Sequence, residues 1–563
     1  MTETPAPTPI DALAGRFWES FLQLHPTTAT MYGDPRYDDQ LDDPGPAGRA
    51  AIRKLAEDTR AEAEAVDPVG LSTEDRITRD MLIVLGDLAV AEDDLHMHRL
   101  RGVDQIAGPQ AVLPQIATLQ PADTPERLEK FLGRLRAYGP YMDAYQGIVR
   151  ESLDSGVTAP RIVTERTIEQ LKRLLAIPLD QAVVPAMARV ASDADRERVR
   201  EVVGDVVLPK QQAYLDLLER EYLAKSREEP GLWSAPGGDA LYRQAIRSWT
   251  TLDLEPADVH RIGLEELATI DAERRALAAR HGFGDDVVRY RDSLTADPAN
   301  VPRSRDELIA RATEDIGRAG DLAPQWFGRT PRAACEVRPV EEFKEKDAPF
   351  AYYYPPTVDG SRPGIYYVNT YDLPSRTYLK LASTTYHEAI PGHHFQIALE
   401  IEHPSLNVFR RLGSRLVGGA FAEGWGLYSE RLADEMGLYR DDGERLGMLD
   451  AAAWRAGRLV VDSGMHGLRW SRQQSIDFLL GAGLSNTDAV IETDRYIAWP
   501  GQALTYMIGL REIRRLRQEI EQRDGAAFDI RAFHDAILGH GSLPLATLER
   551  ELPRWVPEPA GAS

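Results

Sequence analysis

The sequence predicts a mainly α protein that carries one small β-sheet. Most of the chain has apolar residues at helical spacing, with capping residues in front of them. Three short β-type runs break this pattern, and all of them lie between about residues 335 and 370. The chain has neither a repeat of fixed period nor a low-complexity tract. These observations favour a small sheet inserted into a helical protein.

Four helices have recognisable starts. An N-cap residue or a proline in the first turn marks them at Ser72–Asp75, Thr124–Pro125, Pro256 and Ser304–Glu307. Apolar residues at helical spacing follow the first three: Ile77, Leu82, Ile83 and Leu85; Leu128, Phe131, Leu132 and Leu135; and Val259, Ile262, Leu264, Leu267 and Ile270. We expect these faces to pack into the core, and we expect Gly282 to end the third helix.

The β-type runs cover Cys335–Val340, Phe350–Tyr354 and Gly364–Val368. Pro355–Pro356 and Asp359–Gly360 separate the later two runs as turn signals. Helical periodicity then returns and continues to about Leu548.

The length of 563 residues would allow about three to five domains. We expect a disordered N-terminus over residues 1–9, a helical half over 10–300, a half with the sheet and the chemistry over 301–556, and a disordered tail over 557–563. No Gly/Ser-rich linker separates the halves. They are therefore expected to pack together around one cleft.

Charge and composition exclude several classes of function. The net charge of −23 makes the chain a poor general binder of nucleic acid or of an anionic membrane. The chain has no run of about 18 apolar residues, so we expect no membrane-spanning helix. The N-terminus does not resemble a secretory signal. The single cysteine, Cys335, excludes an intrachain disulfide, and no thiol-activating group lies beside it in the sequence. We expect a cytoplasmic protein whose oligomeric state is open.

A cluster of histidines carries the strongest chemical signal. The run His387-Glu388-Ala389-Ile390-Pro391-Gly392-His393-His394 departs from the simple H-E-x-x-H zinc motif, because a proline stands four residues after the first histidine. The next histidines follow at six and seven residues. On a straight helix the seventh residue lies about 10.5 Å along the axis, too far for two ligands of one ion. The helix must therefore bulge or break if both histidines bind one metal.

Pro391 and Gly392 supply that break, because proline lacks the N–H donor and glycine accepts unusual backbone angles. Taking up two extra residues there would bring His393 to the place of the usual second histidine. We therefore favour His393 over His394 as the second ligand, while His394 stays open as the alternative.

Zinc normally takes a third protein ligand and keeps one position open for water. Glu423 is the best candidate, since it lies 30 residues after His393 among small and aromatic residues. Glu430 stands seven residues further on, at about the same face of the expected helix, and could support a histidine ligand.

Several segments resemble one known family. They are Pro363–Thr370, His387–Gln396, Ala422–Glu430, Val460–His466 and Arg495–Gly509, with further likeness at Pro26–Thr30, Gly33 and Leu254–Ile270. Together they are similar to the signature blocks of the bacterial family called domain of unknown function 885. The resemblance implies a zinc-peptidase-like protein, a large two-lobed helical fold around a central cleft, similar to zinc peptidases of the thimet oligopeptidase and angiotensin-converting enzyme type. It also places the small sheet near the metal.

The residues of these segments suggest further roles. A short strand with Tyr367 and Asn369 could lie at a sheet edge and hold a substrate backbone. His466 follows Asp462 at helical spacing, so the carboxylate could orient the ring to stabilise an oxyanion. The alternative for both features is a structural role.

A third segment surrounds the turn at Pro500. Tyr496 is the first choice for a hydroxyl that stabilises the tetrahedral intermediate, whereas Arg495 and Tyr506 are expected to bind substrate. The alternative is that both tyrosines are core aromatics with polar tips.

The main hypothesis is a zinc-dependent amide hydrolase, most plausibly a metallopeptidase acting on short peptides. One zinc per chain would be held by His387, His393 and Glu423, and Glu388 would act as general base and then general acid. Tyr496 or His466 would help to hold the oxyanion. Two alternatives stay open: a metal-dependent enzyme acting on a non-peptide small molecule, and a catalytically silent binding protein with a structural metal.

Overall fold

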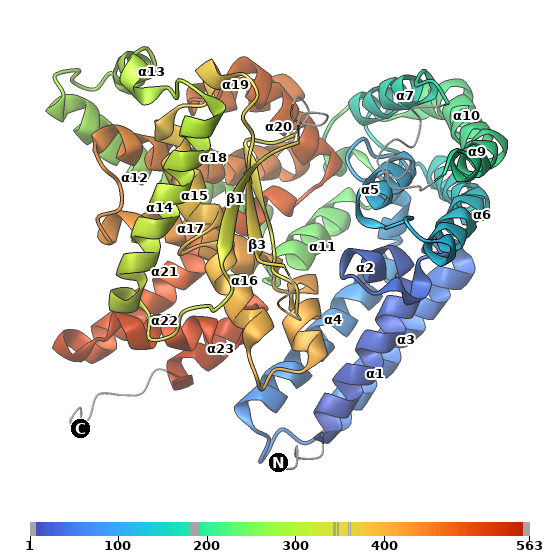
Figure 1. The fold of residues 1–563 in the computed structure, drawn as a ribbon, viewed down its shortest axis with the longest axis horizontal. Coiled ribbons are helices and arrows are strands. Elements are labelled where there is room, and N and C mark those ends of the chain that lie inside the picture. The colour runs from blue at the N-terminus through green and yellow to red at the C-terminus, as the bar shows by residue number, and fades with distance from the viewer. Residues whose placement is uncertain are drawn as a thin grey trace.

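A computed structural model describes residues 7–179, 192–341, 345, 348–358, 360 and 362–555. Helices make up most of this part of the chain, and its three named strands form a single sheet (Figure 1). The prediction of a mainly α protein with a small sheet is therefore confirmed. In the described residues, no helix is long and apolar enough to cross a membrane.

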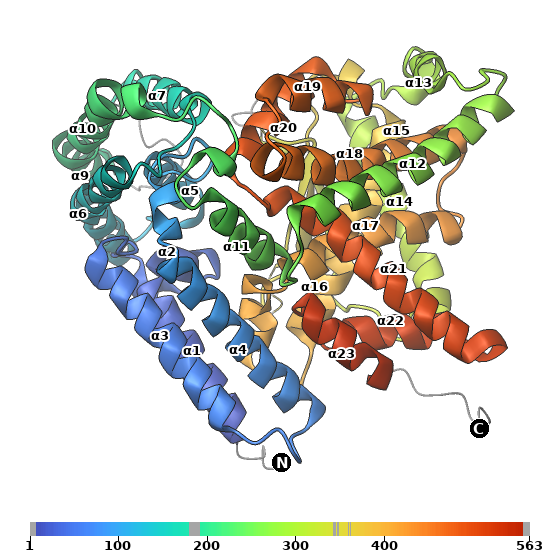
Figure 2. The ribbon, with the colours of Figure 1, turned by 180° about the vertical axis from the view of Figure 1, so that it is seen from behind.

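The N-terminal helices gather on one side of the molecule, where Figure 2 shows them in blue and green. They are α1 (Pro9–Leu24), α2 (Pro26–Met31), α3 (Pro46–Ala65), α4 (Thr73–Asp94), α5 (Val112–Leu119), α6 (Pro125–Ser155), α7 (Arg161–Leu175), α9 (Asp193–Val202) and α10 (Leu208–Leu217). Of the predicted disordered N-terminus, residues 1–6 lie outside the described residues, as does the whole predicted C-terminal tail at 557–563. Thr8 and Pro9 are ordered instead, because Thr8 caps α1 and Pro9 begins it.

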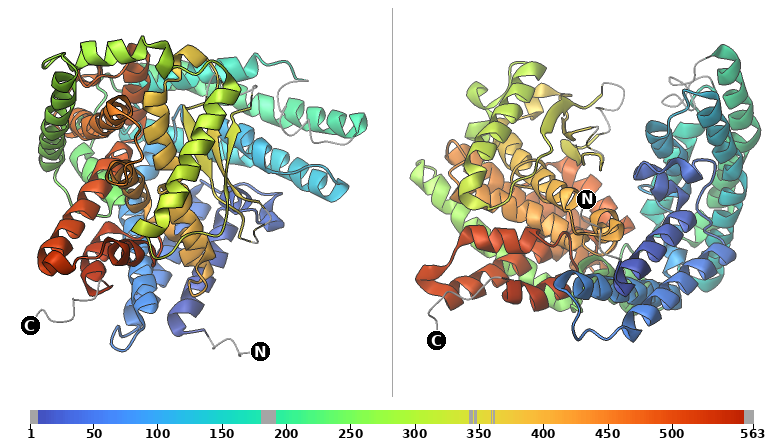
Figure 3. Two further views of the ribbon diagram at one scale, coloured as in Figure 1. Left: turned by 60° about the vertical axis from the view of Figure 1, so that its left-hand side comes forward. Right: turned by 60° about the horizontal axis from the view of Figure 1, so that its bottom comes forward.

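The remaining helices form the larger body that carries the sheet (Figure 3). They are α11 (Gly238–Thr250), α12 (Pro256–Arg280), α13 (Val287–Thr295), α14 (Arg305–Trp326), α15 (Tyr378–Glu388), α16 (His393–Glu402), α17 (Gly419–Glu435), α18 (Asp442–Gly467), α19 (Arg472–Gly481), α20 (Asn486–Ala498), α21 (Thr505–Asp524), α22 (Ile530–Leu538) and α23 (Leu545–Trp555).

The predicted helix starts are confirmed at all four places. Ser72, Thr124 and Ser304 each accept a hydrogen bond from a backbone N–H in the first turn, and Pro256 begins α12. The expected core face of α12 is wrong at one position, because Leu264 is 45% exposed. Val259 and Ile262 do face the core, so the buried stripe is narrower than the apolar pattern suggested.

The three strands are β1 (Cys335–Pro339), β2 (Ala351–Tyr354) and β3 (Gly364–Val368). Their order is β1-β3-β2, with β1 parallel and β2 antiparallel to β3. The three strands are thus confirmed, but β3 is the central strand. The prediction that β3 offers a free edge to substrate is wrong, because both of its hydrogen-bonding edges are occupied.

Helices cover one face of this sheet. Leu308 and Ala312 of α14 and Leu381 of α15 pack in one apolar cluster with Tyr366 and Val368 of β3. This packing attaches the sheet directly to α15, the helix whose last turn carries the first histidine of the motif.

The largest apolar core contains residues from α1 to α4, from α11 to α18 and from α21 to α23. A second core joins α6, α7, α9 and α10 to α18, α19 and α20. Helices from both sides of residue 300 therefore share one core. The division near residue 300, the two-lobed shape and the central cleft stay predictions.

Candidate metal centre

The histidine motif lies where one helix ends and the next begins. α15 ends at Glu388, Ala389 leaves the helical region, and α16 begins at His393. The peptide bond between Ile390 and Pro391 is cis. The predicted break at Pro391 and Gly392 is therefore confirmed as a turn between two separate helices.

Gly392 leaves room for the turn. Its backbone angles, φ −80° and ψ −132°, lie outside the helical and extended regions, and a Cβ atom there would lie 1.9 Å from the carbonyl oxygen of His387. The unusual backbone angles expected at this glycine are therefore present. The carbonyl of Pro391 accepts hydrogen bonds from Trp425 Nε1 at 2.9 Å and Ser429 Oγ at 3.3 Å. These bonds hold the turn against α17.

This turn brings three predicted metal ligands together. One ligand atom each from His387, His393 and Glu423 lie within 4.8 Å of one another. Nε2 of His387 is 3.7 Å and Nε2 of His393 is 3.5 Å from Oε2 of Glu423. The two imidazole planes are almost perpendicular, at 85°. Two imidazoles and a carboxylate in this arrangement are a typical donor set for a catalytic zinc ion.

Glu430 orients the first histidine. Its Oε1 lies 2.8 Å from Nδ1 of His387, which leaves Nε2 directed to the triad. Gly426 lets α17 approach, because a Cβ atom there would lie 2.7 Å from Cε1 of His387. The supporting role predicted for Glu430 agrees with this contact.

The electrostatics of the triad favour a bound cation. Burial lowers the pKa of His387, but hydrogen bonds to Glu423 and Glu430 outweigh this effect and raise the pKa to about 9. Burial would raise the pKa of Glu423, whereas the two imidazoles bring it far below its ordinary value. Two carboxylates thus surround two imidazoles in a buried place, and the residues fit a divalent cation in charge and in donor type.

His394 lies outside the triad. Its Nε2 donates to the carbonyl of Ala333 at 3.0 Å, so Nδ1 accepts from the hydroxyl of Tyr353 at 2.9 Å. Burial lowers its pKa to about 4. Both ring nitrogens are therefore committed to joining α16 to the sheet. The geometry supports His393 as the second ligand, so the described residues offer three candidate ligands at this place.

Glu388 is the last residue of α15 and lies next to the first ligand. It is half-buried and makes no hydrogen bond with a described residue. Burial raises its pKa, while His393 and His387 oppose this shift. A carboxylate beside the candidate ligands, without a hydrogen-bond partner among the described residues, is available for proton exchange.

The predicted oxyanion role of His466 is wrong. Its Nε2 donates to the carbonyl of Tyr496 at 3.0 Å, and its Nδ1 accepts from the N–H of Leu232 at 3.2 Å. Asp462 does not hold the ring, because it accepts from Tyr242 and from the N–H of Gly501. These are bonds of a structural core.

Tyr496 is also structural. Its hydroxyl donates to Glu492 at 2.6 Å and accepts from Nε of Arg458 at 2.9 Å, while the side chain is buried. Tyr506 is better placed, since its ring centroid lies 6.4 Å from that of His387 and its hydroxyl has no partner among the described residues. The sequence indicated both tyrosines, and a role for Tyr506 at the substrate stays a prediction.

The other predicted substrate contacts are spread over several elements. Asn369 is buried, and its amide donates to the carbonyls of three residues in the loop before β2. Arg495 donates to Gln502 at 2.6 Å. Tyr367 stacks on Tyr352 on the sheet. The role predicted for Asn369 is wrong, because its polar atoms are used inside the fold.

Two arginines of α18 were missed. Arg455 Nη2 is 3.8 Å from Oε1 of Glu430, and the guanidinium of Arg458 lies 4.5 Å from the ring centroid of Tyr506. They stand three residues apart, on one side of α18. Their helical spacing beside Trp454 was visible in the sequence, but nothing there indicated which helix faces the histidines.

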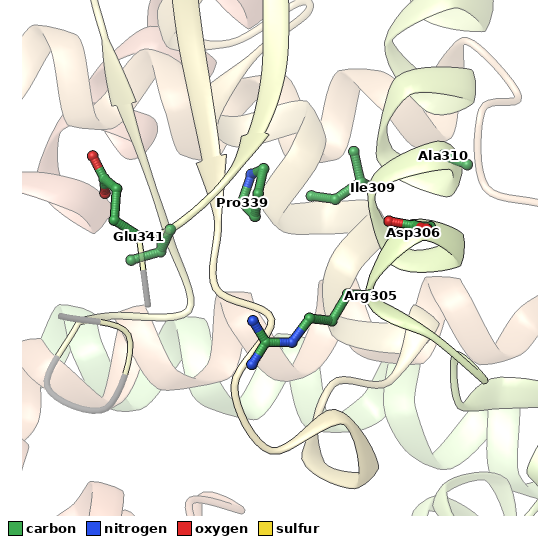
Figure 4. Close-up of a pocket in the computed structure, with 7 residues that line it drawn as sticks. Arg305, Asp306, Ile309, Ala310, Pro339 and Glu341 are labelled. Carbon is green, nitrogen blue, oxygen red and sulfur yellow. The ribbon is translucent and has the colours of Figure 1, made fainter. Parts of the chain in front are cut away.

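A surface cavity lies away from the triad. It has a volume of about 550 Å³ and is lined by Arg305, Ile309, Pro339 and Val340 among others, between the start of α14 and the end of β1 (Figure 4). It contains none of the triad residues. The chemistry of the donor set, rather than cavity size, therefore identifies the candidate site.

Comparisons with known proteins agree with this fold. A family model described as "Bacterial protein of unknown function (DUF885)" matches residues 26–552. The crystal structure of a candidate lipoprotein from Colwellia psychrerythraea is similar with a TM-score of 0.89 and 27% identity, covering 97% of this chain and 98% of that one. A candidate lipoprotein of unknown function from Shewanella oneidensis shares the fold with a TM-score of 0.76 and 20% identity, covering 96% and 99%. No curated protein matches the chain.

Proposed function

We propose that this chain, which belongs to the bacterial DUF885 family, is a zinc-dependent amide hydrolase that acts as a metallopeptidase on short peptides. The observation that carries the proposal is the convergence of His387, His393 and Glu423, with the unpartnered carboxylate of Glu388 beside them. The cytoplasmic location expected from the sequence stays a prediction.

Each residue of the site has a defined task in this proposal. His387, His393 and Glu423 would hold one zinc ion, which when bound polarises the scissile carbonyl and acidifies water. Glu430 fixes the tautomer of His387 through Nδ1. Glu388 accepts a proton from the attacking water and delivers it to the leaving amine. The hydroxyl of Tyr506 donates to the oxyanion in place of Tyr496 and His466.

The commitment of His394 to the sheet supports catalysis over a silent metal site. A structural zinc usually has four protein ligands, whereas a catalytic zinc keeps one position open. With both nitrogens of His394 bonded elsewhere, the described part of the chain offers three ligands for the ion. A metal-dependent enzyme with a non-peptide substrate would use the same residues, so substrate class is decided by experiment.

The test is the substitution Glu388→Gln in zinc-loaded protein. We expect zinc content to be unchanged and hydrolysis of a short-peptide library to fall by about 10²–10⁴-fold, because an amide cannot accept the proton of the water. Glu435→Gln is a matched control, since Glu435 also ends a helix but pairs with Arg517 at the surface.

Three outcomes separate the possibilities. The proposal is supported if the protein hydrolyses peptides only with zinc and if Glu388→Gln abolishes this hydrolysis. Hydrolysis of non-peptide amides or esters alone supports the second kind of enzyme. Zinc-loaded protein that hydrolyses none of these substrates contradicts the proposal and favours a silent binding protein.

A further inference from the structure

Two cations that form no ion pair within the described residues lie at the start of α15. The guanidinium carbon of Arg376 is 5.3 Å and Nζ of Lys380 is 5.0 Å from the ring centroid of Phe350. Two like charges are thus held at one aromatic ring. Their repulsion is relieved when an anion binds between or beside them.

Neither cation is neutralised within the described part of the chain. Arg376 donates through Nε to the carbonyl of Tyr371, and Lys380 forms no ion pair there. This is unusual in a chain with 89 acidic and 66 basic residues, where a basic side chain readily finds a carboxylate. Desolvation by the surrounding protein lowers the pKa of Lys380, and Arg376 and Arg455 lower it further against the opposing effects of Asp488 and Glu492.

Lys380 also has the right place relative to the triad. It stands seven residues before His387 on α15, so it lies on nearly the same face and about 10.5 Å back along the axis. An extended peptide spans about 3.3–3.6 Å per residue, so this interval corresponds to about three residues. Lys380 is exposed to solvent despite its surroundings and is therefore accessible to a ligand.

Further positive charge lines the same side of the site. Arg458 of α18 is buried beside the ring of Tyr506 and pairs through Nη2 with Glu492 at 3.2 Å, while its Nη1 has no partner among the described residues. Arg455 lies beside Glu430. Arg455 and Arg458 thus add positive charge near the triad, next to the carboxylates of Glu430 and Glu492.

We infer that Arg376 and Lys380 form a carboxylate-binding subsite that receives the C-terminus of a peptide substrate. The enzyme would then cleave within about three residues of that terminus, because the span from Lys380 to the triad fixes the distance to the scissile bond. This inference rests on the proposed function. It adds the end of the substrate that is recognised and the residues that recognise it.

Equilibrium binding tests the subsite apart from catalysis. Acetyl-pentaalanine with a free C-terminus and its C-terminal amide are titrated calorimetrically into zinc-loaded Glu388→Gln protein. We expect the free acid to bind at least about tenfold more tightly, since a hydrogen bond to a charged group has this effect. Lys380→Gln should abolish this preference, and Lys380→Arg should restore most of it.

Two controls sharpen the result. Arg289→Gln removes a cation that also lies over a phenylalanine, Phe283, but on the peripheral helix α13, and it should leave the preference unchanged (Figure 1). An amidated peptide with one internal glutamate tests an acidic side chain as the source of the carboxylate. If that peptide binds as tightly as the free acid, the assignment to the C-terminus is overturned.

Failure of this inference differs from failure of the proposed function. Equal binding of acid and amide, no binding of either, or a preference that Lys380→Gln leaves intact would overturn the subsite. Zinc-dependent cleavage of both peptides would still uphold a peptidase. A preference for the free acid that depends on Lys380, without hydrolysis by the wild-type protein, would uphold the subsite and contradict the peptidase.

Discussion

At the scale of single residues, the position of a candidate metal ligand depends on neighbouring residues that are not ligands themselves. Glu430 holds His387 by Nδ1, and the missing side chain at Gly426 lets that ring sit against α17. His394, beside the second ligand, is turned to Ala333 and Tyr353 instead. Neighbouring histidines in the sequence thus have unrelated roles because they leave α16 in different directions.

His393→Ala and His394→Ala should therefore differ in kind. We expect His393→Ala to lose most bound zinc, because it removes one of three protein ligands. His394→Ala should retain zinc but lower the free energy of unfolding by about 1–3 kcal/mol, because the carbonyl of Ala333 and the hydroxyl of Tyr353 lose their partner. Metal analysis and urea denaturation of both variants measure these effects. Equal zinc retention would contradict the assignment of the second ligand.

Candidate site residues could be predicted from the sequence where they lie together in one short segment. His387, Glu388 and His393 form one short motif, and the spacing alone indicated a break between them. Tyr496 and His466 could not be judged in this way. Their polar atoms are taken by Glu492, Arg458 and Leu232, and a pattern of residue types does not reveal which distant partner uses a polar group.

At the scale of elements, the turn between α15 and α16 replaces the continuous helix of the simple motif. The chain leaves the helix after Glu388 and re-enters it at His393, with the carbonyl of Pro391 fixed to α17. Capping residues and β-type runs predicted the helix starts and the three strands, because these signals act within a few residues. The central position of β3 could not be predicted, since strand order depends on partners distant in the chain.

Gly392→Val should disrupt the site although residue 392 holds no ligand atom. A Cβ atom would collide with the carbonyl of His387, 1.9 Å away, so the turn must open and separate His387 from His393. We expect zinc affinity to fall by at least tenfold, an effect comparable to loss of an outer-shell partner. Zinc titration with a competing chelator measures it. Gly147→Ala, at a helical glycine with open space around it, is the control. Unchanged zinc affinity in Gly392→Val would contradict the role of the turn.

At the scale of the whole molecule, buried neutral histidines join elements that are distant in the chain. His534 connects the carbonyl of Trp326 to the hydroxyl of Tyr428, and His466 connects Leu232 to Tyr496. The cores they belong to mix helices from both ends of the sequence. The arrangement of these helices lay beyond sequence analysis, because amphipathic faces show that a helix is buried but not against which partner.

These histidines predict loss of stability in acid. Burial lowers the pKa of His466 to about 4 and that of His534 to about 3, both below the value of the unfolded chain. Between about pH 6.5 and 4 the unfolded state therefore binds more protons, so stability is full above pH 6.5 and falls as the pH decreases. Each histidine contributes a slope of up to about 1.4 kcal/mol per pH unit.

Denaturation in urea at several pH values between 4.5 and 7 measures this slope. His534→Gln should reduce the number of protons taken up on unfolding by about one, and thus lower the slope by up to about 1.4 kcal/mol per pH unit. Glutamine keeps polar atoms at this place but does not titrate. The surface variant His281→Gln is a matched control, since His281 pairs with Asp442 at the surface. An unchanged slope in His534→Gln would show that other groups cause the acid sensitivity.

The most direct test of the central claim is a crystal structure of the zinc-loaded protein with anomalous diffraction recorded at the zinc absorption edge. We predict one anomalous peak per chain, about 2.0–2.2 Å from Nε2 of His387, Nε2 of His393 and a carboxylate oxygen of Glu423, with one position left to solvent. The absence of a peak at this triad, or a peak coordinated by His394, would contradict the account.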